Sequence, residues 1–323
     1  MAYVIGIDGG GTNTRAVLAD LGGEIYATAF AGSTNPNTVS QEVLMNTFSR
    51  IMGELENEAP RQYEQVITIF AGISGSSGEM AKEKIKQIIH HIVSERINVI
   101  VETDAINALY SGTYGEYGMV QIAGTGSVTY GVNQFQQQGR VGGWGYLVGD
   151  EGSGYAIGQQ GIAASLKSFD GRGQGTVLLE MLYDYFQVTN CEQLVSHIYS
   201  SSSPKNEISS VAKLVFKAYK QKDRIAEEII DDASKDLLLS VTTLYKKLFI
   251  NNERVKLVLC GGIFSDPDIL PSLIKSGLKK HINMVNVVIP TIPPVGGSII
   301  AAYIAAGEKI SEKTIHCLQT NFK

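Results

Sequence analysis

Strand-like runs in the first part of the chain alternate with short polar or glycine-rich breaks. The runs cover residues 3–7, 14–19 and 24–30, and Asp8–Gly11 and Gly22-Gly23 separate them. Runs of this length bounded by glycine are typical of β-strands joined by tight turns. The chain is therefore predicted to begin with a meander of three strands.

Helical and strand-like patterns alternate after this meander. Apolar residues recur at helical spacing in 41–56 and 80–94, and short apolar runs occupy 66–70 and 97–101. A further helix is predicted to begin at Ala105. Strands that alternate with helices indicate the α/β class and predict a mixed sheet covered on both faces.

The same organisation recurs in the second part of the chain, which predicts two domains of one type. We expect the first domain to span residues 1–116 and the second, with a helical insertion, to span 117–307. A tail at 308–323 either returns to the first domain or frays. Strands are predicted at 119–122, 127–132, 255–260 and 285–289, with helices between 155 and 249 and at 298–306.

Composition and charge exclude several classes of protein. The 323 residues include 27 basic and 32 acidic side chains, a formal net charge of −5. Without a basic field to hold phosphate backbones, neither nucleic acid nor a membrane surface is expected as a partner. The 35 glycines have no period of three, so the chain is not collagen-like.

Cysteine usage and hydropathy favour a cytoplasmic protein. The three cysteines, Cys191, Cys260 and Cys317, lack the C-x-x-C spacing of zinc or iron–sulfur sites. Unpaired cysteines suit a reducing compartment. The N-terminus has no signal-peptide pattern, and the apolar stretch 299–306 is far shorter than the roughly 18 residues that span a bilayer.

Glycine clusters follow three of the predicted strands, at Asp8–Thr12, Ala123–Ser127 and Cys260–Gly262. Glycine lets the backbone approach a ligand and direct N–H groups at an anion. Asp8, at the end of a buried strand, suits Mg²⁺ bound through water. These features predict a site for a nucleoside triphosphate with its metal. Its candidate phosphate-binding residues are Gly9, Gly10, Gly11, Thr12, Gly124, Thr125, Gly126, Ser127, Gly261 and Gly262.

The glycine loops also have a simpler interpretation, in which glycine supplies the positive φ of a tight hairpin. Two common nucleotide-binding patterns are absent from the sequence. There is no G-x-x-x-x-G-K-[ST], and no G-x-G-x-x-G follows a strand and opens a helix. P-loop and dinucleotide-binding folds are therefore not expected.

Two carboxylates outside these loops are candidates for substrate chemistry. The glycine-rich segment 142–154 contains the only tryptophan, Trp144, together with Asp150, and this combination suits a sugar whose hydroxyls need acceptors. Alternatively, Asp150 caps the following helix. Asp104 ends a strand, where ligands gather in open α/β sheets, and could accept a proton from an attacking hydroxyl. Alternatively, it caps the helix that begins at Ala105.

These segments together resemble one family. Residues 6–12, 33–35, 103–105, 124–127 and 143–153 occur in the order seen in N-acetylglucosamine kinases. Those kinases belong to the acetate and sugar kinase/Hsp70/actin superfamily, in the branch of the BadF/BadG/BcrA/BcrD ATPases. The resemblance runs from Tyr3 to about Ala306, and its Trp-bearing block is the most specific part.

The resemblance implies two ribonuclease H-like domains, an actin-like ATPase duplication, with a cleft between them. It implies that the second domain binds ATP, that Asp8 organises Mg²⁺, and that Gly261-Gly262 approaches the adenosine part. Asp104 is implied to be the general base on the sugar hydroxyl, most often O6. The sugar-binding residues that it implies are Asn35, Asp104, Gly143, Trp144, Gly145 and Asp150.

The implied activity is ATP-dependent phosphorylation of an amino sugar at O6, with N-acetylglucosamine first. Glucosamine and N-acetylmuramic acid stay open, because the motifs do not fix the surroundings of the 2-amino and 3-hydroxyl groups. Two other classes also stay open. One is a non-catalytic nucleotide- or sugar-binding protein, and the other is an ATPase activator of a 2-hydroxyacyl-CoA dehydratase, whose cysteine pattern is absent here. A homodimer is common in the family, and nothing in the sequence tests it.

Overall fold

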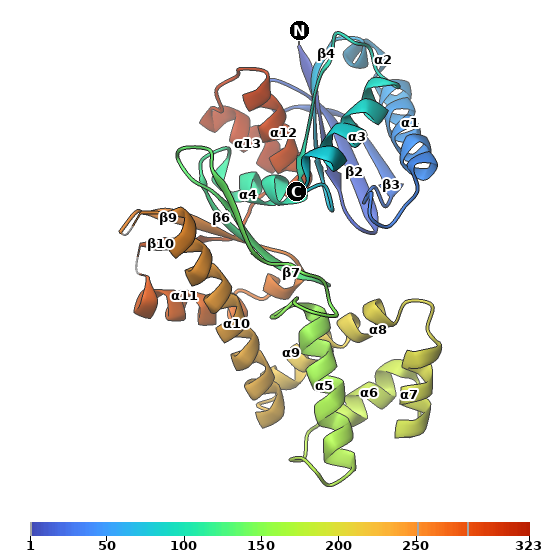
Figure 1. The fold of residues 1–323 in the computed structure, drawn as a ribbon, viewed down its shortest axis with the longest axis vertical. Helices are drawn as coiled ribbons and strands as arrows, with labels where there is room; N and C mark the ends of the chain where they lie inside the picture. The colour runs from blue at the N-terminus through green and yellow to red at the C-terminus, as the bar shows by residue number, and fades with distance from the viewer. Residues whose placement is uncertain (1, 251, 283) are drawn as a thin grey trace. The chain divides into compact units, whose positions relative to one another are not determined.

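A computed structural model describes residues 2–250, 252–282 and 284–323 (Figure 1). The chain forms two compact units. The first comprises residues 1–118 and 288–323, and the second comprises residues 119–287. Each unit contains one five-stranded sheet flanked by helices.

The sheet of the first unit has the strand order β3-β2-β1-β4-β5. The first three strands form the predicted antiparallel meander, and β1, β4 and β5 run parallel. The carboxyl ends of the parallel strands therefore lie at one edge of the sheet, where ligands gather in such folds. The strands are β1 (Tyr3–Gly9), β2 (Asn13–Asp20), β3 (Ile25–Gly32), β4 (Val66–Ile73) and β5 (Asn98–Thr103).

Helices cover both faces of this sheet. α1 (Gln41–Glu58) and α3 (Glu79–His90) bury their apolar stripes against Ile5 and Ile7 of β1. Gly6 lies between these two residues and so faces the opposite side, where α12 (Pro294–Ala305) packs on β1. The remaining helices of the unit are α2 (Pro60–Tyr63), α4 (Asp104–Thr113) and α13 (Glu312–Asn321).

Close backbone contacts place α12 in the first unit. A Cβ on Gly297 would lie 1.9 Å from the Asn107 carbonyl oxygen in α4, and a Cβ on Gly6 would lie 2.7 Å from the Ile299 nitrogen. Glycine alone permits such an approach. Residues 288–307 therefore differ from the predicted division, which assigned them to the second domain. The tail 308–323 also lies in the first unit.

The sheet of the second unit has the order β10-β9-β6-β7-β8, in which β6 and β9 are parallel and β7 and β8 are antiparallel. Its strands are β6 (Gly118–Ala123), β7 (Ser127–Val132), β8 (Gln138–Gly142), β9 (Val255–Cys260) and β10 (Val285–Val288). The helical insertion comprises α5 (Gly154–Phe169), α6 (Leu178–Phe186), α7 (Cys191–Ser200), α8 (Pro204–Ser210), α9 (Ala212–Lys220) and α10 (Arg224–Leu248). A 3₁₀ turn, η1 (Gly262–Phe264), precedes α11 (Leu270–His281).

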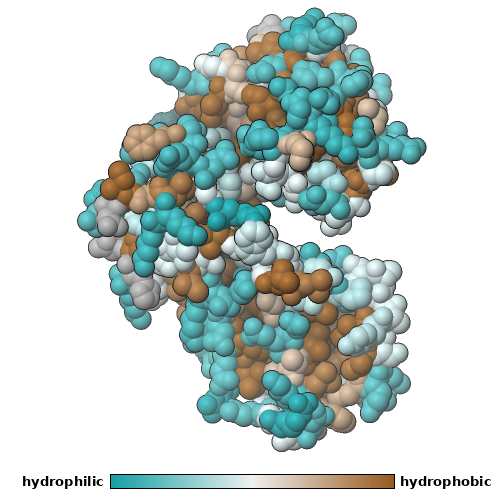
Figure 2. All heavy atoms as spheres, viewed as in Figure 1, coloured by the Kyte–Doolittle hydropathy of each residue, from teal (hydrophilic) through white to brown (hydrophobic). Residues whose placement is uncertain are grey.

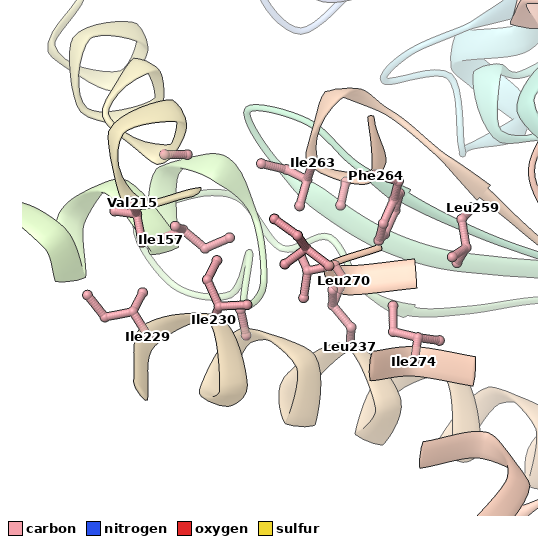
Figure 3. Close-up of a cluster of buried hydrophobic side chains, with 14 of the residues drawn as sticks. Ile157, Val215, Ile229, Ile230, Leu237, Leu259, Ile263, Phe264, Leu270 and Ile274 are labelled. Atoms are coloured by element: carbon pink, nitrogen blue, oxygen red, sulfur yellow. The ribbon is translucent and has the colours of Figure 1, made fainter. Parts of the chain in front are cut away.

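The core of the second unit joins the insertion to the sheet. Figure 3 shows Ile157 of α5, Val215 of α9 and Ile230 of α10 together with Leu259 of β9 and Ile274 of α11. All five side chains are almost fully buried. Because one cluster links helices and sheet, the insertion folds as part of this unit and positions the amino end of α5.

Figure 2 shows hydrophilic side chains over much of the visible face, interrupted by hydrophobic patches in the helical part of the second unit. Among the described residues, no helix combines the length and apolar character that crossing a membrane requires.

Side-chain hydrogen bonds to the backbone fix two of the connections. Asn133 Oδ1 accepts hydrogen bonds from the Phe135 and Gln137 nitrogens at 3.0 Å, and β8 begins at Gln138. The Asp266 carboxylate accepts from the Asp268 nitrogen in a turn, and α11 begins at Leu270.

Gly297→Ala is expected to destabilise the protein by about 1–3 kcal/mol, because the added Cβ must separate α12 from α4. Gly53 in α1 is the matched control, since a Cβ there would meet nothing within 4 Å. Gly53→Ala is expected to raise stability by roughly 0.5–1 kcal/mol. Urea denaturation measures both, and shifts of the same sign for the two variants would contradict the packing argument.

Candidate active site

Asp8 lies near the carboxyl end of β1, and its carboxylate is held by α4. Asn107 Nδ2 donates to Asp8 Oδ1 at 2.8 Å and to the carbonyl oxygens of Ile7 and Gly72 at 3.2 and 3.1 Å. A Cβ on Gly72 would lie 2.2 Å from Asn107 Oδ1, so position 72 requires glycine. Asn107 therefore fixes Asp8 relative to β1, β4 and α4.

The pKa of the Asp8 carboxylate is perturbed by its surroundings. Its pKa is raised to about 6, chiefly by burial. The Asn107 hydrogen bond and the Arg15 guanidinium lower the pKa, and the neighbouring Asp104 carboxylate raises it. Two carboxylates thus lie close enough to interact, and the Arg15 guanidinium is a nearby positive charge. Such perturbed groups concentrate at functional sites.

Asp104 is the first residue of α4 and lies half-buried. Its Oδ1 accepts from Thr103 Oγ1 at 3.2 Å, and its carboxylate also accepts from the Ser74 hydroxyl and the Ala105 N–H. Burial raises the pKa of Asp104, and these hydrogen bonds lower it. The alternative interpretation of Asp104 as the helix cap is wrong, because Thr103 occupies that position.

Two residues of the site, Asn107 and Arg15, were not predicted from the sequence. Arg15 stands opposite Asp8 in the β1–β2 register, and its guanidinium lies 5.3 Å from the ring centroids of both Phe30 and Phe322. Within the described chain, its buried Nε has no hydrogen-bond partner. Two features of the sequence could have identified these residues. Arg15 is a charged residue inside an apolar strand, and Asn107 is a polar residue one helical turn after Asp104.

The loop Gly9–Thr12 joins β1 to β2, and crowding explains two of its glycines. A Cβ on Gly9 would lie 2.3 Å from Thr34 Oγ1, and a Cβ on Gly10 would lie 2.9 Å from the Asn13 carbonyl oxygen. None of the three glycines has a positive φ. The simpler interpretation, a hairpin that needs positive φ, is therefore wrong for this loop.

Asn35 lies beside this loop and beside the turn after β4. Its Oδ1 accepts from the Asn37 nitrogen at 2.9 Å. A Cβ on Gly75 would lie 2.3 Å from the same oxygen, and a Cβ on Gly11 would lie 4.0 Å from Asn35 Nδ2. The first unit thus brings Asn35, the Gly9–Thr12 loop and Ser74, the partner of Asp104, to the same edge of its sheet.

In the second unit, the loop Gly124–Ser127 is tied to the start of α5. The Gly154 and Tyr155 nitrogens donate to the carbonyl oxygens of Gly124 and Thr125 at 2.7 and 3.3 Å. Gly124 and Gly126 do not have a positive φ, so the hairpin interpretation is wrong here as well. A Cβ on Gly124 would meet nothing within 4 Å, which leaves open space beside this backbone.

Asp150 connects two glycine-rich loops. It accepts from the Gly145 nitrogen at 3.1 Å and also from the Ser127 N–H, and a Cβ on Gly126 would lie 2.8 Å from its Oδ2. Burial raises the pKa of Asp150. Its interpretation as a helix cap is wrong, because Ser153 caps α5 by accepting from the Ala156 nitrogen at 3.1 Å.

Trp144 projects from the neighbouring loop. Its side chain is exposed, and the Arg140 guanidinium lies 4.3 Å from its ring centroid. Gly143 and Gly145 flank it with φ values of 71° and 97°, a conformation that favours glycine. Glycine on both sides therefore turns the aromatic ring outward while Gly145 remains bonded to Asp150.

Gly261 lies at the end of β9 beside the end of β6. Its φ is 117°, and a Cβ there would lie 2.2 Å from the Ala123 carbonyl oxygen. A Cβ on Gly262 would meet nothing within 4 Å. The second unit therefore gathers three glycine segments that the sequence analysis identified separately, at Gly124–Ser127, Gly143–Gly145 and Gly261-Gly262.

The carboxylates fit a magnesium ion held mainly by a nucleotide. Among the described residues, no group of three or more His, Cys, Asp or Glu side chains could hold a metal. Mg²⁺ usually keeps several waters and takes one or two carboxylates together with phosphate oxygens. Asp8, buried and only partly compensated, suits that limited role.

Asp8→Asn is expected to stabilise the ligand-free protein at pH 8. The pKa of Asp8 in the folded protein, about 6, exceeds the ordinary value of 3.8. The wild-type protein therefore loses stability as the pH rises from 3.8 to 6, and the loss is complete above both values. At about 1.4 kcal/mol per pKa unit, the gain reaches at most about 3 kcal/mol. This gain in stability should vanish below about pH 4. Urea titrations at several pH values test this, with the exposed Asp184→Asn as control, and a pH-independent gain would refute it.

Gly124→Val is expected to weaken ATP binding at least about tenfold while the free energy of unfolding changes by less than about 1 kcal/mol, because the side chain enters the open space beside the loop. Gly175→Val is the matched control, since a Cβ there also meets nothing within 4 Å. Calorimetric titration with a nonhydrolysable ATP analogue measures the affinity. Unfolding as large as the binding defect would count against the assignment.

Curated sugar kinases are similar to this chain over almost their whole length. The N-acetylmuramic acid/N-acetylglucosamine kinase of Clostridium acetobutylicum is 32% identical over 302 residues, covering 94% of this chain and 98% of that protein. The N-acetyl-D-glucosamine kinase of Dictyostelium discoideum is 31% identical over 308 residues, covering 92% and 97%.

Solved structures share the fold. A candidate N-acetylglucosamine kinase from Chromobacterium violaceum superimposes with a TM-score of 0.72 at 22% identity, covering 93% of this chain and 98% of that chain. A ROK family glucokinase from Streptomyces griseus, solved with glucose and AMPPNP, superimposes with a TM-score of 0.59 at 14% identity, covering 95% of this chain and 100% of that chain. The predicted α/β class with two similar units is confirmed.

The family comparison agrees with the relatives. The BadF/BadG/BcrA/BcrD ATPase family matches residues 5–305, which include all of both sheets except the first two residues of β1, and every glycine loop described above. Taken with two relatives above 30% identity over more than nine-tenths of the sequence, this match means that the chain belongs to the BadF/BadG/BcrA/BcrD ATPase family.

Proposed function

We propose that this protein transfers the γ-phosphoryl group of ATP to the 6-hydroxyl of an amino sugar, with N-acetylglucosamine as the first candidate. The observation that carries the proposal is Asp104, a half-buried carboxylate fixed at the start of α4 beside Asp8. Phosphoryl transfer depends on positioning, charge stabilisation and a group that accepts the acceptor's proton. Asp104 is suited to that last task.

Asp104 acts as the general base in this proposal. Burial raises its pKa, which makes it a better proton acceptor than an ordinary aspartate. The sugar oxygen attacks the γ-phosphorus, its proton passes to Asp104, and the bond to the β,γ-bridging oxygen breaks, so that ADP leaves with the electron pair. Thr103, Ser74 and the Ala105 N–H keep the carboxylate in place.

The glycine loops have separate proposed roles. The backbone N–H groups and hydroxyls of Gly9–Thr12 and Gly124–Ser127 are proposed to hold phosphate oxygens, and Gly261-Gly262 to approach the adenosine part. When bound, Mg²⁺ would neutralise charge on the phosphates. Asp8, oriented by Asn107, would hold it through water.

The relatives support an amino-sugar acceptor. N-acetylglucosamine is in the name of both relatives above 30% identity, and a glucosamine kinase of Vibrio cholerae is 26% identical over 252 residues. Asn35, Gly143, Trp144, Gly145 and Asp150 are proposed as sugar-binding residues. Asn35 offers an amide to the sugar, and Asp150 offers a carboxylate whose burial raises its pKa.

The cysteine positions do not favour the alternative as a redox ATPase. An iron–sulfur cluster shared between two subunits needs thiolates that a partner can approach. Cys191 and Cys260 are buried, and Cys317 lies at hydrogen-bonding distance from Glu24, 3.6 Å away. The sugar kinase is therefore the function that we propose.

Asp104→Asn is expected to lower kcat for sugar phosphorylation by about 10²–10⁴-fold, because the amide cannot take up the proton, while ATP affinity is kept. ADP formation with Mg-ATP measures this across N-acetylglucosamine, glucosamine and N-acetylmuramic acid, with Asp184→Asn as the control for loss of one charge.

The same assay separates the alternatives. Without stimulation of ADP formation by any sugar, the kinase proposal fails. If a sugar stimulates wild type and Asp104→Asn equally, the kinase proposal stands and the assignment of the base is wrong. The sugar with the highest kcat/KM identifies the substrate.

A further inference from the structure

Arg15 is a charged residue of the first unit to which the proposed reaction assigns no role. It stands opposite Asp8 in the β1–β2 register and opposite Phe30 in the β2–β3 register. Directly paired residues of antiparallel strands project from the same face of a sheet. Asp8, Arg15 and Phe30 therefore form a row across one face, which Asp8 shares with Gly6 and on which α12 packs.

Charge couples Arg15 to Asp8. Burial lowers the pKa of Arg15, and the Asp8 carboxylate raises it, so the carboxylate favours the charged guanidinium. The buried Nε of Arg15 has no hydrogen-bond partner among the described residues. Contacts other than a hydrogen bond at Nε therefore orient the guanidinium beside Asp8.

Two aromatic rings supply such contacts. The Arg15 guanidinium carbon lies 5.3 Å from the ring centroids of both Phe30 and Phe322, within the range of cation–π attraction. Phe30 is exposed, whereas Phe322 is half-buried. A Cβ on Gly296 would lie 2.9 Å from Cε2 of Phe322, so glycine at this position of α12 leaves room for the ring. The contact between Phe322 and Arg15 is therefore built into the packing of the first unit.

The helix that precedes Phe322 is docked at several points. α13 ends at Asn321, whose Nδ2 donates to the Gly23 carbonyl oxygen between β2 and β3 at 3.2 Å. Gln319 Nε2 donates to Thr291 Oγ1 at 2.9 Å, shortly before α12. Leu318 is fully buried. These contacts fix the position from which the Phe322 ring reaches Arg15.

We propose that the C-terminal tail is part of this site, and that Phe322 is a positioning residue which holds the Arg15 guanidinium beside Asp8. The inference rests on the function proposed above, in which Asp8 takes part in binding a nucleotide with its metal. The ionised carboxylates of Asp8 and Asp104 repel the phosphates of an approaching nucleotide, and a guanidinium fixed next to them reduces that repulsion. Phe322 thus acts on nucleotide binding through Arg15.

A purely structural role for Phe322 leads to a different expectation. If the ring only fills the space beside Gly296, leucine can replace it with little loss, because leucine is also apolar and branched. If the face of the ring attracts the guanidinium, leucine fails and tyrosine succeeds, because tyrosine keeps the aromatic face. The two substitutions therefore separate attraction from the filling of space.

The test measures the affinity of the full chain for a nonhydrolysable ATP analogue with Mg²⁺ by calorimetric titration. Phe322→Leu is expected to weaken binding about threefold or more, and Phe322→Tyr to stay within about twofold of wild type. In an Arg15→Met background, Phe322→Leu is expected to have no further effect, because the cation that it acts on is absent. Phe169→Leu changes an exposed phenylalanine of α5 and is the matched control, which should bind as wild type does.

Three results would overturn the inference. The leucine and tyrosine variants could bind the analogue equally, Phe322→Leu could weaken binding as much without Arg15 as with it, or the wild type could fail to bind the analogue. Failure of the kinase proposal is a separate result. In that case no sugar stimulates ADP formation, while binding of the analogue still depends on an aromatic residue at position 322.

Discussion

The side-chain amide of Asn107 is the contact on which the arrangement of the first unit's site depends. Its Nδ2 reaches the Asp8 carboxylate and the backbones of β1 and β4 at once. This is possible only because Gly72 has no Cβ. The backbone carbonyl oxygen of Asn107 lies 1.9 Å from where a Cβ on residue 297 would be. Helix α12 can therefore pack against α4 only if residue 297 is glycine. One residue therefore links the position of a carboxylate to the packing of α4 and α12.

In the second unit, the carboxylate of Asp150 connects backbone segments as the amide of Asn107 does in the first. Asp150 joins the N–H groups of Gly145 and Ser127 and leaves no room for a Cβ on Gly126. In both units, a polar side chain, buried for Asn107 and half-buried for Asp150, lies against glycines whose missing Cβ atoms make the hydrogen bonds possible. Close approach explains most of these glycines. Gly143 and Gly261 also have a positive φ, and a positive φ alone explains Gly145.

Periodicity sufficed to predict the order of strands and helices, because one face of each element is buried and its apolar residues must recur at the period of that element. It could not place α12. That helix is buried nearly all round, so its sequence has no polar face to show which sheet it covers, and its assignment depends on the Gly297 and Gly6 contacts. Likewise, Asp8 and Asp104 were found from their places after strands, whereas Asn107 emerges only once α4 is packed on β1 and β4.

The stability of the first unit and its chemistry make opposing demands on Asp8. Burial beside Asp104 raises the pKa of Asp8, so the ionised form is held at some cost in folding free energy. A fold selected only for stability would place a neutral side chain there, and Asn107 could donate to it equally well. A desolvated charge that is only partly compensated is useful chiefly when a cation arrives to share it, since the same burial that destabilises the free carboxylate strengthens its attraction for the ion. The role that we propose for Asp8, holding a metal-bound nucleotide, would account for this cost.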